Sequence, residues 1–345
     1  MDLTAQKIKR GIFISLTGSM LAVAVIIFLS QDSFNLQIFR RVQPFYMLLA
    51  AGITISFWLI KSIKLSLLVE SLGRDIPFYR IFSIYLASVF VAHVTPSTSG
   101  GLPFQIYFLH REGMALGETT ALTVLESMLN ALFFLLTTPF LLFLWGRYLQ
   151  MGVTITRLFY ISVVVVVGFI IFSLFLVFNT DFARHFFDWI LRRKIINKLF
   201  SQEKLVKFKS FLIKEIGFFE RGLNALLTEK ENFFYVLFYT FLYWGFYFSL
   251  APILIKGLGV NTPLIPVILS QLVFNFIQPV IPTPGASGGA ELSFAYFFKF
   301  ILPARYLGVF VALWRFFVYY ASFVVGGLFF INLIRYSGFL QKSRN

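Results

Sequence analysis

The phrase PSTSGGLP at Pro96–Pro103 returns as PGASGGAE at Pro284–Glu291, and both copies interrupt strongly apolar sequence. The two copies share the pattern P-x-x-S-G-G. Proline and paired glycines break helices, and a broken helix inside a bilayer must turn its free amides and carbonyls toward protein, water or a ligand. Secondary transporters commonly place such breaks at matching positions of two repeats, with half-helix starts pointing at an anionic substrate group. The duplicated break therefore predicts a transporter-like site within a membrane.

The composition places the chain among membrane proteins. Of its 345 residues 58% are apolar and 13% are charged, and the mean hydropathy is +0.82. These values predict a polytopic helical membrane protein rather than a soluble domain. The net charge of +15 comes from basic residues clustered between apolar stretches, which favours contact with anionic lipid over nucleic acid. Cysteine is absent and the three histidines have no ligand spacing, so we expect no metal site and no cofactor.

Apolar stretches of about 18 residues or more predict about six full transmembrane helices. The predicted spans are Gly11–Leu29, Phe45–Leu68, Glu118–Trp145, Leu158–Phe178, Phe233–Ile255 and Tyr306–Ile334. Two further segments, 78–110 and 263–300, each contain one Gly-rich phrase and a returning arm that is too short to cross a bilayer. We predict that each forms a re-entrant helical hairpin within an all-α fold.

The distribution of Lys and Arg predicts the orientation in the cell membrane. Residues 179–232 form a basic segment that we place in the cytoplasm, and both termini follow it there if both hairpins are re-entrant. The same count places the basic residues from Lys61 to Arg80 inside. Three crossings separate the hairpins, so the second hairpin enters from the opposite face and the repeats are inverted. We expect a single domain, 1–345, with repeat 1 over about 45–178 and repeat 2 over about 233–334.

The basic segment 179–232 also carries apolar residues at helical spacing between Phe208 and Leu226. This pattern predicts an amphipathic helix. The helix either lies on the inner leaflet or packs against the bundle as a connector.

The spacing of the repeated phrase predicts that two charged residues in apolar spans lie close together. Pro284 lies 188 residues after Pro96, and the same offset places Glu126-Ser127 opposite Trp314-Arg315. We therefore expect Glu126 and Arg315 to meet near one axis, at a depth where ionisable groups face the bundle interior, a water-filled cavity or each other.

Each charged residue has a structural alternative. Glu126 and Arg315 form either a static ion pair or part of a substrate site, and the planar guanidinium of Arg315 favours recognition of phosphate or carboxylate. Glu291 begins a half-helix, where capping alone accounts for a carboxylate. His93 is either a hydrogen-bonded interior histidine or a proton relay.

The residues around both breaks resemble the lysylphosphatidylglycerol synthase transmembrane, or flippase-like, family. The resemblance covers nearly the whole chain and is carried by Thr95–Tyr107, Pro282–Glu291, and Trp314-Arg315 with Tyr319-Tyr320. In bifunctional members it implies a membrane region that moves aminoacylated phosphatidylglycerol between leaflets, and a separate soluble domain that transfers lysine to the lipid. No such soluble domain follows the last span in this sequence, so we expect no transferase activity from it.

The sequence departs from many relatives at Leu102, Gln105 and Ser127, so the resemblance does not carry over the substrate. We expect a flippase for an anionic or aminoacylated phospholipid or a polyprenyl-phosphate lipid, with the two hairpins meeting around a headgroup cavity near the midplane. The candidate substrate-binding residues are Ser99, Gly100, Gly101, Glu126, Ser287, Gly288, Gly289, Glu291 and Arg315.

The sequence leaves two other classes of function open. It is also compatible with a homo-oligomer. One is a membrane-embedded enzyme of the phosphatidylglycerol lysyltransferase type, although the sequence contains no recognisable nucleophile–base pair or nucleotide loop. The other is a scaffold subunit that binds a partner through residues 179–232.

Overall fold

The computed structural model describes residues 42–95, 98–146, 152–179, 202–278 and 288–336, together with Thr17, Leu21, Phe182, Arg184 and Trp189. These residues are mostly helical and contain no strand. The predicted span Gly11–Leu29, apart from Thr17 and Leu21, lies outside the described residues. So do the prolines that open the two Gly-rich phrases, Pro96 and Pro284, and the candidate residue Ser287.

Five helices of the described chain are long and apolar enough to cross a membrane. Four are single helices, and the fifth is continuous through a wide π-helical turn, η3, between α14 and α15. Their bounds are α3 Pro44–Glu70, α6 Leu116–Trp145, α7 Val153–Phe178, α11 Lys230–Gly257, and α14 Ala304–Arg315, η3 Phe316–Tyr320 and α15 Ala321–Tyr336. They contain the last five predicted spans, which confirms an all-α polytopic membrane protein.

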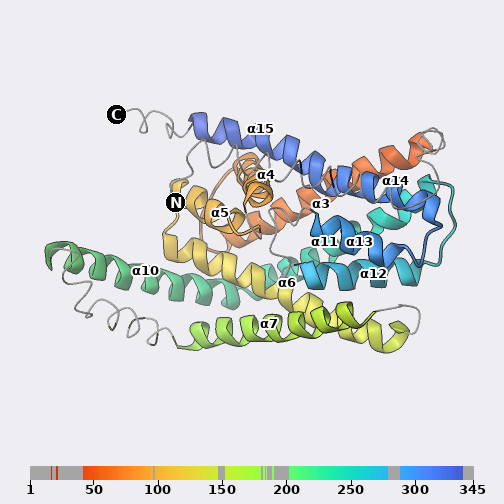
Figure 1. Cartoon of the computed structure of the whole chain (residues 1–345). Coiled ribbons are helices and arrows are strands. Elements are labelled where there is room, and N and C mark those ends of the chain that lie inside the picture. The colour runs from red at the N-terminus through yellow and green to blue at the C-terminus, as the bar shows by residue number, and fades with distance from the viewer. Residues whose placement is uncertain are drawn as a thin grey trace.

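Four shorter helices form two pairs, α4 Phe78–Val94 with α5 Gly101–Arg111, and α12 Leu264–Ile277 with α13 Gly289–Phe298. At a rise of about 1.5 Å per residue even α4 is only about 26 Å long, which is less than the hydrocarbon core of a bilayer. The two pairs lie toward opposite ends of the long helices (Figure 1). Their re-entrant entry from opposite faces stays a prediction that agrees with this placement.

The joint between α4 and α5 explains the paired glycines of the first phrase. The backbone amide of Gly100 donates to Thr95 Oγ1 at 2.9 Å. A Cβ added at Gly100 would lie 2.6 Å from Thr95 Cγ2, and one at Gly101 would lie 2.9 Å from the Cβ of Ala92. Such distances leave no room for a side chain, so the glycines let the start of α5 pack directly against the end of α4.

Helices of the two predicted repeats pack against each other. Helix α3 packs along α11, which the predicted repeat makes its counterpart. Helix α4 packs on α15, and α12 packs on α6, so each short pair contacts the span that follows the short pair of the other half. One continuous hydrophobic core includes residues of both halves. This arrangement is the one expected of interlocked repeats.

Helix α10, Gln202–Thr228, packs along α6. The amide of Gly117 at the start of α6 donates to Glu215 Oε2 at 2.7 Å, and Leu223 and Leu226 are buried. Phe208 and Phe211, nearer the start of α10, are 49% and 43% exposed. The second half of α10 is therefore a packed connector, and the first half keeps an uncovered apolar face.

Candidate functional site

Arg315 and Glu291 form a fully buried ion pair at the second Gly-rich phrase. Arg315 Nε donates to Glu291 Oε1 at 2.8 Å, and the two side chains are 2% and 0% exposed. The other carboxylate oxygen of Glu291 accepts the Gly288 amide at 2.7 Å and so caps the start of α13. Gly288 has φ +83°, a conformation that glycine adopts without strain. Glu291 therefore both caps α13 and orients Arg315.

The end of α4 reaches the same place through aromatic contacts. Arg315 Cζ lies 4.1 Å from the ring centroid of Tyr319, and the His93 ring lies 4.3 Å from that of Tyr319. His93 is in the last turn of α4, three residues before Pro96 opens the first phrase, and Tyr319 is in the π-helical turn η3. π-Helical turns frequently mark functional sites. The last turn of α4 and the start of α13, which flank the two Gly-rich phrases, thus meet at Arg315 and Tyr319.

At least two of the glycine amides in the phrases are already hydrogen-bonded within the protein. Gly100 and Gly101 are buried in the α4–α5 joint, while Ser99 just before them is exposed. The amide of Gly100 is bonded to Thr95 and that of Gly288 to Glu291. Gly289 is the first residue of α13. The buried charged side chains beside the second phrase are Glu291 and Arg315.

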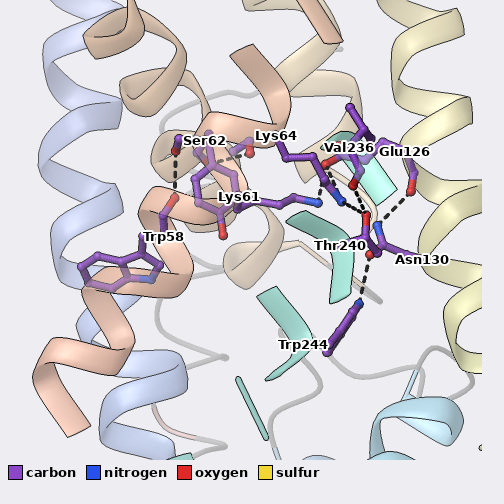
Figure 2. Close-up of polar contacts among 11 residues, drawn as sticks. Trp58, Lys61, Ser62, Lys64, Glu126, Asn130, Val236, Thr240 and Trp244 are labelled. Carbon is purple, nitrogen blue, oxygen red and sulfur yellow. Dashed lines mark hydrogen bonds and ion pairs between the residues drawn. The ribbon is translucent and has the colours of Figure 1, made fainter. Parts of the chain in front are cut away.

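Glu126 does not meet Arg315, which corrects the expectation from the sequence offset. Glu126 projects from α6 toward α3, where its Oε1 lies 2.6 Å from Lys61 Nζ and 3.3 Å from Lys64 Nζ (Figure 2). The offset compares positions along the chain. Which helix a side chain contacts depends instead on the direction in which it points around the helix axis. Lys61, Lys64 and Glu126 are called the lysine cluster below.

A hydrogen-bond network ties the lysine cluster to α11. Lys64 Nζ donates to Thr240 Oγ1 at 3.4 Å. Asn130, one turn after Glu126 on α6, donates to the Glu126 carbonyl at 2.9 Å and accepts from Trp244 Nε1 at 3.2 Å (Figure 2). Three spans, α3, α6 and α11, are therefore joined by polar side chains in their interior.

Sequence reasoning missed both lysines of this cluster. They were counted with the basic residues of the following loop, although Lys61 and Lys64 lie inside the predicted span Phe45–Leu68. Their spacing of three residues places them on one face of a helix. A pair of lysines on one face of an apolar span was the signal for an acidic partner in the membrane interior.

Two tyrosines of α11 lie next to the lysine cluster. Lys61 Nζ is 5.8 Å from the ring centroid of Tyr243, and the Tyr243 and Tyr247 rings are stacked with centroids 6.2 Å apart. The cluster therefore borders a row of aromatic side chains with polar ends on α11.

Comparisons with known proteins agree with the membrane fold. The family described as the lysylphosphatidylglycerol synthase TM region matches residues 12–326. A UPF0104 membrane protein of Archaeoglobus fulgidus is 27% identical over 320 residues, which cover 92% of this chain and 94% of that protein. A UPF0104 membrane protein of Methanothermobacter thermautotrophicus is 19% identical over 293 residues, covering 84% and 86% respectively. No solved structure matches the chain. The family match extends over most of the sequence, and the chain belongs to the family of the lysylphosphatidylglycerol synthase TM region.

Proposed function

We propose that the protein is a flippase-like lipid transporter, which moves an anionic or aminoacylated phospholipid, or a polyprenyl-phosphate lipid, between the two leaflets. The observation that carries the proposal is that the helix ends beside both Gly-rich phrases meet at buried Arg315. Glu291 at the start of α13 binds its guanidinium, and Tyr319 lies against both Arg315 and His93 of α4. Membership of a family named for a lipid-modifying synthase supports a lipid substrate.

The chemistry of the ion pair fits an anionic headgroup. Ionisable side chains are costly within a membrane, and those that occur there commonly mark substrate or ion pathways. A guanidinium presents planar donors that match the oxygens of phosphate. Glu291 keeps Arg315 neutralised before the lipid arrives, and the headgroup phosphate then competes with Glu291 for the same cation. The acyl chains stay in the bilayer throughout.

The packing of the two halves supports exchange between two exposures of this site. Each short pair contacts the span that follows the short pair of the other half, so movement of one half relative to the other would shift both short pairs. Alternating access in transporters with inverted repeats arises from such relative movement of the halves.

The test is leaflet exchange of fluorescent phosphatidylglycerol in liposomes that contain the purified protein, read by quenching from outside. Removal of Arg315 alone leaves Glu291 buried and unpaired, which itself threatens folding. The informative variant is therefore Glu291→Gln/Arg315→Gln, which removes both charges and keeps polar groups at both positions. Arg305→Gln is the matched control, because Arg305 lies at the exposed start of the same helix.

We expect the double variant to exchange lipid roughly tenfold more slowly or worse, since a loss of about 1.4 kcal/mol in binding already lowers affinity tenfold. The Arg305 control should match the wild type. Mass spectrometry of the recovered lipid distinguishes movement from chemical modification. A folded double variant that exchanges lipid at the wild-type rate sinks the proposal.

A further inference from the structure

The lysine cluster holds two amino groups for one carboxylate. Lys61 Nζ and Lys64 Nζ lie 2.6 and 3.3 Å from the same oxygen of Glu126, so two cations share one carboxylate. The side chains of Lys64 and Glu126 are 0% and 4% exposed. With both lysines protonated, the cluster carries one surplus positive charge in the interior of the helix bundle.

The other carboxylates described on the three helices around the cluster are engaged or distant. On α3, Glu70 accepts from Ser66 and is exposed. On α6, Glu118 is bound at 2.9 Å by Arg74. On α11, Glu231 lies in the first turn and is exposed. Within the described residues, no second carboxylate of α3, α6 or α11 neutralises the surplus charge, and an unpaired charge removed from water is costly.

We propose that the lysine cluster is a second binding site, which takes the phosphodiester of an anionic phospholipid headgroup. A phosphodiester carries one negative charge and neutralises the cluster, whereas a pyrophosphate carries more than the cluster can balance. Lys61, whose side chain is 18% exposed, makes the contact with a phosphate oxygen. Lys64 stays behind it, paired with Glu126 and bonded to Thr240. The inference rests on the proposed function, because it narrows the transported lipid to phosphodiester phospholipids.

Lys61→Gln is the test variant, because it removes the surplus charge and leaves Lys64 and Glu126 as a balanced pair that favours folding. Lys256→Gln is the matched control, since Lys256 is an exposed lysine on neighbouring α11. The full-length protein is titrated with phosphatidylglycerol in phosphatidylcholine mixed micelles, and native mass spectrometry counts the retained lipid. Glycerophosphoglycerol, the headgroup without acyl chains, is added as a competitor in a separate arm.

We expect Lys61→Gln to bind phosphatidylglycerol about tenfold more weakly than both the wild type and the Lys256 control, with phosphatidylcholine retention unchanged. Lys61→Arg should restore binding. Competition by glycerophosphoglycerol supports a site that reads the headgroup alone, and absence of competition supports one that also needs the lipid chains.

Equal affinity of the wild type and Lys61→Gln for phosphatidylglycerol overturns the inference. The lysine cluster then only stabilises the packing of the helices. The two proposals fail separately. If the wild type binds phosphatidylglycerol through Lys61 but exchanges no lipid in liposomes, the second site stands and the transporter proposal falls. If lipid exchange depends on Glu291 and Arg315 while Lys61→Gln binds normally, the transporter stands and the second site falls.

Discussion

Glu126 is the carboxylate shared by buried Lys64 and partly buried Lys61, and its removal is expected to destabilise the protein. Glu126→Gln leaves Lys61 and Lys64 beside a neutral amide, with Lys64 fully buried. Breaking a buried ion pair by removing one partner costs about 3–5 kcal/mol. The midpoint of thermal unfolding in detergent should therefore fall clearly in Glu126→Gln and stay unchanged in the exposed control Glu231→Gln. Equal midpoints would show that the lysines are not both charged.

At the residue scale the sequence predicted that these charged residues lie in the interior, but it did not predict all of their partners. Glu126, Glu291 and Arg315 all lie in the interior, because ionisable residues in the middle of apolar spans have few other places to go. The partner of Arg315 was not predictable from spacing, since Glu291 is 24 residues away and faces it only when α13 folds back beside α14. Capping of α13 by Glu291 was predictable, because it involves only neighbours in the chain.

Helix α15 lies so close to α4 that one glycine sets their separation. A Cβ at Gly326 would overlap the Leu86 carbonyl and lie 3.1 Å from Phe90 Cβ. Gly326→Val should push the helices apart at a cost of about 1–3 kcal/mol, as overpacking typically does. The thermal midpoint should fall, while Gly168→Val on α7, where a Cβ meets nothing within 4 Å, should leave it nearly unchanged. The same drop in both variants would point to lost helix propensity instead.

At the element scale, hydropathy predicted the spans because each is a long apolar run that outweighs local detail. Helix α4 begins and ends at the predicted Phe78 and Val94, where proline and threonine flank it. The sequence allowed α10 either to lie on the inner leaflet or to pack against the helix bundle. The structure shows that its two halves differ in how far the bundle covers them. Leu226 is 2% exposed against the bundle and Phe208 is 49% exposed. Amphipathic spacing identifies the apolar face of a helix but not what covers it.

The whole molecule has a predicted orientation that its lack of cysteine makes easy to test. Lys207→Cys on α10 should react with a membrane-impermeant maleimide only from the cytoplasmic side. Asn261→Cys, between α11 and α12, should react only from the outside, because one crossing, α11, separates the two sites. Each position is exposed, so each labels efficiently in opened membranes as a control. Labelling of both from the same side would contradict the predicted arrangement of crossings.

The mutual packing of the two halves is the part of the architecture that the sequence could not give. The repeated phrase indicated two similar units, but the contacts of α4 with α15 and of α12 with α6 join segments far apart in the chain. Such contacts depend on the shapes of both faces, as the glycine fit at Gly326 illustrates. The weak sequence similarity between the two halves outside the phrases does not predict which helix faces fit together.

The wide turn η3 has a geometric consequence for the last span. A π-helical turn takes up about one extra residue, which rotates everything beyond it by roughly 100° relative to a regular helix. On one side of the turn, α14 carries Arg315 and packs beside α13; on the other, α15 carries Gly326 and packs on α4. The last span is thus one continuous helix, and the π-helical turn sets the angle about its axis between the face that packs on α13 and the face that packs on α4. Rotation of this helix about its axis would therefore shift its contacts with α13 and with α4 together.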